Sequence, residues 1–518
     1  MAPGGTVPAL EDGTPFPERR LADTALLCRL PIPESFDAEY LEYYRMLPLE
    51  LVEGVLRVAV AGEPHPDAIA DLARSYEAAI DIVPVEPEAL ADAIRQVFAA
   101  SESVVELVRD LSAQDLADVG GGDDQLTDAR GLANQPPVIR FVNLLIREAH
   151  DASASDIHLE ATRDGLRVRL RVDGVLTELP APPRGLQAAV VSRIKLLAEL
   201  DIAERRAPQD GRIRVRLESR ELDLRVSTVP TLYGESVVLR LLDRGGAVVT
   251  LGDLGMSEAM LAEFTRLASK AHGIVLATGP TGSGKTTTLY AALALRHSSS
   301  EKIITVEDPV EYHLGGVTQV PVHVKSGVTF AAALRSILRQ DPDVLMVGEM
   351  RDAETAAIAL QAAMTGHLVF STLHTNDAVS ALTRLVDLQV ESYMIAAAVE
   401  GILAQRLVRR VCAECRERYR PDPAMVSLLA ARPIGELTLL RGRGCAACRQ
   451  TGYRGRTGLF ELLLVTDELR QALVESAALP ALRAAAREQG MTTLKEDGWA
   501  KVQAGITTVE EVLRVVQD

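Results

Sequence analysis

A glycine-rich segment carries the clearest chemical signal in this sequence. It reads G-x-x-x-x-G-K-T and consists of Gly279, Pro280, Thr281, Gly282, Ser283, Gly284, Lys285 and Thr286, with Thr287 next in the chain. Glycines allow backbone N–H groups to close around phosphate oxygens. The Lys285 side chain is expected to reach the β- and γ-phosphates of ATP, and the Thr286 hydroxyl is expected to ligate Mg²⁺.

The segments on either side of this loop have the pattern that such chemistry needs. Residues 274–277 form a short apolar run that predicts a buried strand, and residues 286–293 predict a helix. A helix that begins at the loop directs its N–H groups and positive potential at the phosphates. A glycine-rich loop without function is the alternative, but strand, loop and helix occur here in the order of a phosphate-binding unit.

Carboxylates end two further apolar runs. Residues 302–306 predict a second buried strand, and the acids that follow it are Glu307, Asp308 and Glu311. Residues 341–349 predict a third strand with Glu349 at its end. An acid at the end of a strand next to a phosphate loop supports Mg²⁺ and its water. Glu349 fits that role, and it could equally orient or deprotonate the attacking water. A solvated strand end is the alternative for the first acidic group.

Two histidines bracket a fourth apolar run at residues 368–370. They are His367 and His374. A single histidine is more often a hydrogen-bonded structural residue than a catalyst. Two histidines at opposite ends of one strand in a phosphate-loop domain could instead sense the γ-phosphate or the metal. We expect this function for at least one of them.

Four of the five cysteines form two C-x-x-C pairs, Cys412 with Cys415 and Cys445 with Cys448. Four thiolates with this spacing suit a closed, structural Zn²⁺ site of tetrahedral geometry. The gap between the pairs is longer than in a minimal zinc ribbon, so a small subdomain is expected to fill it. A redox-active pair is the alternative.

The composition is that of a globular protein with several domains. The chain has 518 residues, of which 47% are hydrophobic and 25% charged, and its net charge is -17. This acidity argues against nucleic-acid binding, which needs a basic surface. The sequence has no secretory signal and no apolar run long enough for a transmembrane helix. We therefore expect a cytoplasmic protein whose membrane association is peripheral.

Hydrophobic patterning divides the chain into six segments. The middle of the chain carries the strongest patterns: residues 166–172 alternate apolar side chains with arginine, which predicts a half-buried strand of an antiparallel sheet, and residues 251–405 alternate strands with helices, which predicts a mostly parallel α/β sheet. The predicted segments are a docking domain at 1–116, a flexible linker at 117–136, an α+β domain at 137–250, the α/β domain at 251–405, the cysteine subdomain at 406–458 and a helical region at 459–518.

The order of these elements resembles the secretion ATPase superfamily, which drives type II secretion and type IV pili. Four signatures match: the phosphate loop, the acidic box at 307–311, the second acidic strand ending in glycine-glutamate at 348–349, and the histidine box. The resemblance covers roughly residues 137–518. It implies a RecA-like ATPase domain preceded by a PAS-like sheet domain, hydrolysis of ATP, and assembly into a homo-hexamer.

The resemblance also indicates which arginines approach the nucleotide. In this family, arginines from the sheet domain and from the ATPase domain converge on it, and the matching positions are Arg225, Arg240, Arg335 and Arg339. Guanidinium groups stabilise the charge on a transferring phosphoryl group. Ordinary surface ion pairing is the alternative for any one of the four.

The resemblance further implies a place of action and a partner. It indicates an ATPase that powers type II secretion through pseudopilus assembly, and that docks through residues 1–116 on a platform protein of the bacterial inner membrane. The cysteine module occurs in assembly-type members of the family and is generally absent from pilus retraction motors. The alternatives are a type IV pilus extension ATPase, a nucleic-acid motor and a catalytically silent scaffold.

Overall fold

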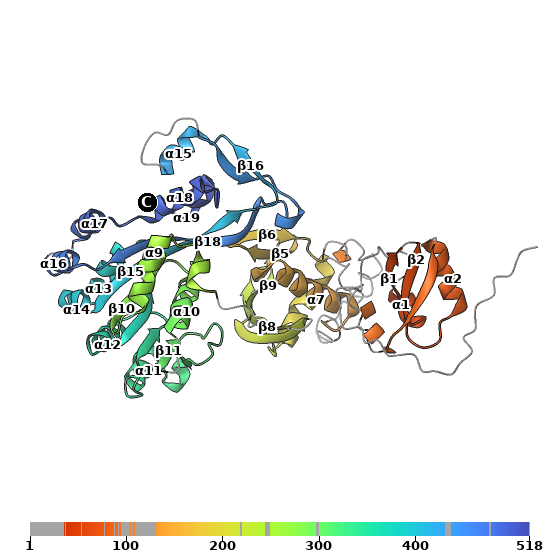
Figure 1. Ribbon diagram of the computed structural model, residues 1–518. Helices are drawn as coiled ribbons and strands as arrows, with labels where there is room; N and C mark the ends of the chain where they lie inside the picture. Colours follow the sequence, from red (N-terminus) through yellow and green to blue (C-terminus); the bar gives the residue numbers. More distant parts are fainter. Residues whose placement is uncertain are drawn as a thin grey trace, which may run out of the picture. The chain divides into compact units, whose positions relative to one another are not determined.

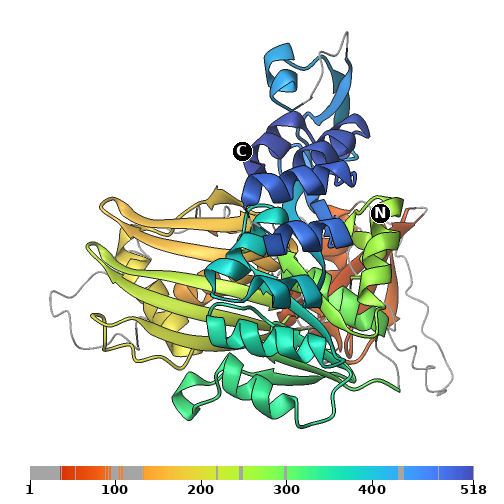
Figure 2. The ribbon, with the colours of Figure 1, turned by 90° about the vertical axis from the view of Figure 1, so that its left-hand side faces the viewer.

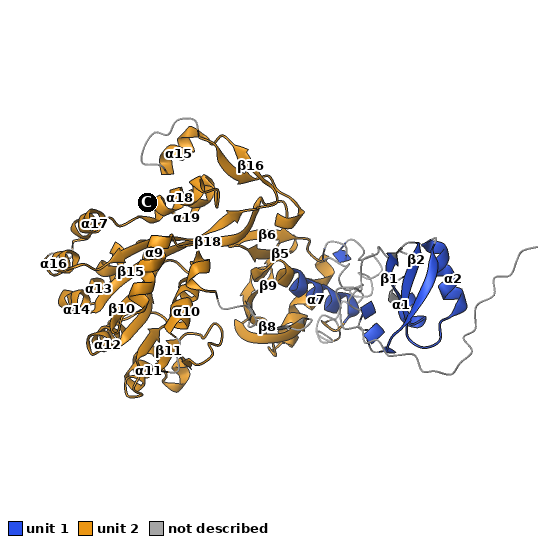
Figure 3. Ribbon diagram, in the orientation of Figure 1, with its two compact units in different colours: residues 1–124, 135–148 blue, residues 125–134, 149–518 orange. Residues whose placement is uncertain are grey.

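The computed structural model describes residues 36–94 apart from 37, 53, 77, 88 and 92, then residues 104, 107, 108 and 131, and finally residues 133–516 apart from 218–219, 244–248, 297–299, 430–436 and 476–477. The chain divides into two compact units, residues 1–124 with 135–148 and residues 125–134 with 149–518 (Figure 3). Most of the predicted linker at 117–136 lies outside the described residues, and so does Cys28.

The first unit contains a small three-stranded sheet. Strand β1 (Met46–Val52) pairs antiparallel with β2 (Val55–Val60), which pairs parallel with β3 (Ala79–Pro84). Its core takes side chains from the sheet and from helices α1 (Ala38–Tyr43) and α2 (Pro66–Ser75). Helix α7 (Pro136–Asp151) runs across the division between the units. Within the described residues, no helix combines the length and the apolar character needed to cross a membrane.

An antiparallel six-stranded sheet opens the second unit, in the order β6-β5-β4-β9-β8-β7. Its strands are β4 (Ala154–Thr162), β5 (Gly165–Val172), β6 (Val175–Leu179), β7 (Gln209–Leu217), β8 (Arg220–Thr231) and β9 (Gly234–Asp243). The 3-10 turn η2 (Arg184–Leu186) leads into helix α8 (Gln187–Leu197), whose buried Lys195 pairs with Glu235 at 2.8 Å. The predicted alternation in β5 is confirmed, and the two-residue turn at Asp173 and Gly174 has positive φ angles, as a tight hairpin needs.

The predicted mostly parallel α/β sheet is confirmed: it has seven strands in the order β12-β11-β13-β14-β10-β15-β18, parallel except for β18. Its strands are β10 (Gly273–Thr278), β11 (Ile303–Glu307), β12 (Thr318–Pro321), β13 (Val344–Val347), β14 (Leu368–Leu373), β15 (Val399–Val411) and β18 (Tyr453–Leu464). Strands β10, β11, β13 and β14 are buried along their whole length, because helices cover both faces (Figure 1).

Alternate residues of β10 enter two separate cores. Ile274 and Leu276 pack in the core that contains α11 (Phe330–Ile337), α12 (Ala353–Met364), α13 (Val379–Asp387) and α14 (Ser392–Ala398). Val275 and Ala277 pack in the other core with α9 (Glu258–Ala268) and α10 (Lys285–Arg296). The short 3-10 turns η3 (Leu251–Leu254) and η4 (Val324–Ser326) complete this region.

The cysteine module is inserted between two strands of the main sheet. The predicted boundaries of the module, at 405/406 and 458/459, fall inside β15 and β18. Between them lie β16 (Arg416–Tyr419), α15 (Pro423–Leu429), β17 (Leu439–Gly442) and the 3-10 turn η5 (Ala446–Cys448). The chain ends in α16 (Asp467–Glu475), α17 (Leu479–Glu488), α18 (Leu494–Gln503) and α19 (Val509–Val515). In Figure 2 the light-blue module stands beyond these dark-blue helices.

Candidate functional site

The phosphate loop connects the end of β10 to the start of α10. Gly282 and Gly284 have φ angles of 79° and 88°, a left-handed backbone conformation that residues other than glycine rarely adopt. Lys285 is buried, and its Nζ donates hydrogen bonds to the carbonyl oxygens of Gly279 and Pro280 at 2.8 and 3.1 Å. Burial lowers the pKa of Lys285 to about 8, while the charge of Glu349 acts in the opposite direction.

Two observations on this loop fit a triphosphate. Among the described residues, Lys285 has no carboxylate within ion-pair distance, so its buried ammonium is held only by neutral carbonyls. The Ser283 hydroxyl is buried and has no hydrogen-bond partner in the described part of the chain. Phosphate oxygens would satisfy both groups, because charge-assisted hydrogen bonds are stronger than those to carbonyls. The Thr286 hydroxyl, on the residue after Lys285, is the group that would hold Mg²⁺ there.

Glu349 lies just beyond the C-terminal end of β13, at the same sheet edge as the phosphate loop. Its side chain is 12% exposed and forms an ion pair with Arg351. Its other carboxylate oxygen lies 3.4 Å from Nε2 of His374, which follows the C-terminal end of β14. The structure therefore brings Glu349 and His374 together at the C-terminal ends of the neighbouring strands β13 and β14.

The acidic box divides into a buried acid and accessible acids. Glu307 is 3% exposed, and its carboxylate accepts hydrogen bonds from the hydroxyl groups of Tyr290 and Thr305 and from the side-chain amide of Gln319. Tyr290 lies on α10, so this network ties the phosphate-loop helix to β11 and β12. Burial and the Glu307 carboxylate raise the pKa of Tyr290. Glu307 is thus enclosed by protein, whereas Asp308 is exposed and Glu311 partly exposed.

The two arginines of the antiparallel sheet lie opposite each other on β8 and β9. Nη2 of Arg225 donates a hydrogen bond to the carbonyl oxygen of Val310 at 3.1 Å, inside the acidic box. Burial lowers the pKa of Arg225, and the nearby Glu311 charge raises it. Nε of Arg240 pairs with Asp156 at 3.1 Å. The structure therefore brings Arg225 to the acidic box and holds Arg240 within its own sheet.

Three other predicted residues are not brought to the phosphate loop. Arg335 pairs with Glu354 on the neighbouring helix, and Arg339 donates to the Arg335 carbonyl at 2.8 Å. His367 precedes β14, so it lies at the opposite sheet edge from His374, and its Nδ1 is 2.9 Å from the Ala362 carbonyl oxygen. Both arginines are exposed and lie one helical turn apart.

The sequence reasoning missed two residues that contact predicted ones. Arg351 follows Glu349 by two positions and carries the positive charge nearest to it. The pKa of Arg351 is raised by its hydrogen bond to Glu349, and Asp308 adds to this effect. Tyr290 lies one turn into α10 and holds Glu307. The only local signals were an arginine beside an acidic strand end and a tyrosine hydroxyl in an apolar helix.

The four module cysteines converge as a metal site requires. Their Sγ atoms all lie within 4.8 Å of one another, with Cys412 and Cys445 3.9 Å apart and Cys415 and Cys448 3.8 Å apart. Tetrahedral zinc with Zn–S bonds of about 2.3 Å places its sulfur atoms about 3.8 Å apart, whereas a disulfide would need about 2 Å. Backbone N–H groups of Cys445 and Gly452 donate to Cys448 Sγ. The cysteines therefore fit Zn²⁺.

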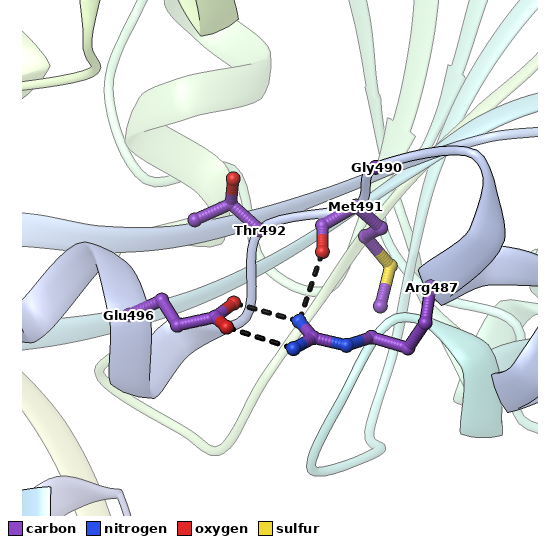
Figure 4. Close-up of a pocket in the computed structure, with 5 residues that line it drawn as sticks. All are labelled: Arg487, Gly490, Met491, Thr492 and Glu496. Atoms are coloured by element: carbon purple, nitrogen blue, oxygen red, sulfur yellow. Dashed lines mark hydrogen bonds and ion pairs between the residues drawn. The ribbon is translucent and has the colours of Figure 1, made fainter. Parts of the chain in front are cut away.

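The described chain also has a shallow hollow between α17 and α18, lined by Arg487, Gly490, Met491, Thr492 and Glu496 (Figure 4). The Arg487 guanidinium forms two hydrogen bonds with the Glu496 carboxylate, at 2.7 and 2.8 Å. A third bond joins Arg487 to the Met491 carbonyl oxygen. Both charges are therefore already neutralised, and we assign the hollow no part in the site.

Loss of one zinc ligand should unfold the cysteine module. We expect Cys412→Ser to lose bound zinc and become protease-sensitive between β15 and β18, because structural zinc supplies roughly 10 kcal/mol of folding free energy in small modules. Elemental analysis and limited proteolysis of the full chain would measure this. Cys28→Ser is the matched control and should keep its zinc. Metal-free wild-type protein with an intact module would contradict the assignment.

Removal of the Tyr290 hydroxyl should destabilise the ATPase domain. In Tyr290→Phe, the buried Glu307 loses one donor, which we expect to lower the free energy of unfolding by about 1–3 kcal/mol. Tyr312→Phe is the control, because Tyr312 packs edge-on against the Tyr290 ring. Urea denaturation of both variants would show the difference. Equal stabilities for Tyr290→Phe and the wild type would contradict the role of the network.

The chain matches known proteins over nearly its whole length. The family model described as "Type II/IV secretion system protein" matches residues 132–514. The type II secretion system protein E of Xanthomonas campestris is 46% identical over 504 residues, covering 96% of this chain and 88% of the relative. The type II secretion system ATPase E of Vibrio cholerae is 44% identical over 455 residues, covering 87% of this chain and 90% of the relative.

Solved structures show the same fold. The pilus retraction motor PilT with bound ADP has 28% sequence identity and a TM-score of 0.51, covering 72% of this chain and 96% of that chain. The ATPase DotB of Legionella pneumophila has 22% identity and a TM-score of 0.54, covering 72% of this chain and 95% of that chain. With the phosphate loop, the neighbouring glutamate and these matches, the chain belongs to the Type II/IV secretion system protein family, and it is an ATPase.

Proposed function

We propose that this chain hydrolyses ATP to power type II protein secretion through pseudopilus assembly at the inner membrane. The observation that carries the proposal is the phosphate loop beside Glu349 and His374, in a chain similar over 96% of its length to a type II secretion system protein E. In this proposal Lys285 binds the β- and γ-phosphates, and Thr286 and Glu349 hold Mg²⁺. Glu349 also orients or deprotonates the attacking water.

The acidic box and the arginines complete the proposed site. Asp308 and Glu311 are accessible, so they are the acids of the box that we assign to the metal and its water. Glu307 is assigned a positioning role, because its carboxylate is already saturated by Tyr290 and its neighbours. The proposed charge clamp on the nucleotide is Arg225. Arg240, Arg335 and Arg339 are left out of it, because their side chains contact other groups away from the loop. A phosphate is a better acceptor for Arg225 than the neutral carbonyl of Val310 that it now contacts.

The proposed assembly is a homo-hexamer attached to the membrane through a partner. Residues 1–116 are the proposed docking domain for an inner-membrane platform protein, and residues 117–136 are the proposed linker. Two features support the docking domain and the secretion role: residues 1–124 belong to a different compact unit from the phosphate loop, and the relatives are named as secretion system proteins. The protein would then act in the cytoplasm as a peripheral component of the membrane. The net charge of -17 favours a protein partner over nucleic acid.

The proposed role of Glu349 separates binding from turnover. We expect Glu349→Gln to bind ATP with Mg²⁺ while its turnover falls by about a hundredfold or more, because a general base contributes roughly that factor. Equilibrium binding of a fluorescent ATP analogue and steady-state phosphate release would measure the two effects. Glu258→Gln, an exposed position on α9, should match the wild type. Normal turnover of Glu349→Gln would remove Glu349 from the mechanism.

The docking role of residues 1–116 can be tested by comparing the full-length chain with a chain that lacks them. The full-length chain should co-purify with an inner-membrane platform protein from detergent-solubilised membranes. A chain that begins at residue 117 should lose this partner while it still binds ATP. Recovery of the same partner by the truncated chain would place the docking surface elsewhere, and recovery of a pilus platform protein would favour pilus extension over secretion.

A further inference from the structure

Two polar residues are buried in the middle of β15, where the strand passes the phosphate loop. Gln405 is 1% exposed and Arg406 is 9% exposed. Strand β15 is the parallel neighbour of β10 (Figure 1). Ala404 is level with Thr278, the last residue of β10. Gln405 and Arg406 therefore lie level with the first residues of the loop, on a strand more than a hundred residues away in sequence.

Gln405 contacts the loop where it enters the helix. Its Oε1 accepts a hydrogen bond of 2.7 Å from the Thr288 hydroxyl, and both groups are buried. Thr288 lies one turn beyond Gly284 on α10. A Cβ atom added to Gly284 would come within 2.8 Å of Nε2 of Gln405. The side chain of Gln405 therefore packs against the C-terminal end of the loop, next to Gly284.

Arg406 and the Gln405 backbone contact the loop where it leaves β10. A Cβ atom added to Gly279 would lie 2.5 Å from the Gln405 carbonyl oxygen and 3.1 Å from Nη1 of Arg406. Nη2 of Arg406 donates to the Asn376 backbone carbonyl at 2.9 Å and to its side-chain Oδ1 at 3.3 Å. Asn376 belongs to the segment after β14 that also carries His374.

Burial of this guanidinium is costly. Within the described part of the chain, Arg406 has no carboxylate within 4.0 Å, and its hydrogen-bond acceptors are neutral oxygens. Burial lowers its pKa, and the more distant charges of Glu461 and Asp377 act in the opposite direction. Because apolar side chains could fill a core position without this desolvation, a simple packing role does not account for the pair.

We propose that Gln405 and Arg406 are positioning residues for ATP binding, which hold both ends of the phosphate loop and join it to the His374 segment through Asn376. The proposal rests on ATP binding at this loop. A loop held at both ends presents its N–H groups in place before the nucleotide arrives, so binding does not have to order it. Once phosphate is bound, the loop is ordered by the ligand as well, and the chemical step depends less on these contacts.

The test compares binding with turnover in the full-length chain. We expect Arg406→Gln to raise the Kd for Mg²⁺–ATP and the KM about tenfold, while kcat stays within about threefold. Thr288→Val removes one hydroxyl group and should shift Kd and KM in the same direction. It carries the test if Arg406→Gln does not fold. Kd is measured with a fluorescent ATP analogue and folding by thermal unfolding.

Arg409→Gln is the matched control, because Arg409 lies on the same strand but pairs with Glu511 and stacks on Tyr453. It should lower the melting temperature and leave Kd unchanged. Unchanged Kd in folded Arg406→Gln and Thr288→Val would overturn the proposal, and so would a loss of kcat without a change in Kd, which would make Arg406 a catalytic residue. If neither the wild-type chain nor Arg409→Gln bound ATP, the result would instead refute nucleotide binding at the loop.

Discussion

The rest of the site depends on the buried ammonium of Lys285, which among the described residues is held only by carbonyl oxygens of its own loop. A cation in this position loses much of its hydration, and burial accordingly lowers its pKa to about 8. A carboxylate in direct contact would relieve that cost, but it would also compete with the triphosphate. The fold therefore keeps its acids at a distance: Glu349 influences the charge of Lys285 but forms its ion pair with Arg351 instead. Neutral contacts hold the loop, and the anionic position is left to the ligand.

The carboxylates of the site are also of two kinds, which differ in how completely their oxygens are hydrogen-bonded by the protein. Glu307 is enclosed by Tyr290, Thr305 and Gln319, so its lone pairs are already used and it stabilises the packing of α10 against β11. Glu349 contacts one exposed arginine and one half-exposed histidine, so its contacts are more easily exchanged for a metal or a water than those of the enclosed Glu307. Acids that look alike in the sequence therefore differ in what they are free to do. The difference arises from the side chains that surround each strand end rather than from the strand ends themselves.

The sequence was sufficient to predict the parallel sheet, the phosphate loop, the antiparallel arginine-bearing strands and the four converging cysteines, because each of these depends on local periodicity or on spacing. It could not show which way a side chain points at a strand end. His367 and His374 flank one strand, but a strand of six residues puts them at opposite sheet edges. Glu307 belongs to the acidic box by sequence but is enclosed by a tyrosine from another helix. Gln405 and Arg406 meet the loop only through the pairing of β15 with β10, which no motif encodes.

The contacts between the antiparallel sheet and the rest of its unit differ in strength, and this difference bears on how hydrolysis could move them. One contact joins Arg225 to the neutral carbonyl of Val310, directly after the buried Glu307. Another joins the Asp173 carboxylate to the Gly455 N–H at 2.8 Å and to Arg456 at 3.4 Å, so that a hydrogen bond and an ion pair act together there. A guanidinium forms a stronger hydrogen bond with a phosphate oxygen than with a neutral carbonyl oxygen. The Asp173 carboxylate is an anion itself and has no attraction to an anionic nucleotide. In the proposed function, ATP would therefore compete for Arg225 and leave the Asp173 contact in place. The hydrogen bond of Tyr290 to Glu307 joins the acidic box to α10, the helix that begins at Lys285.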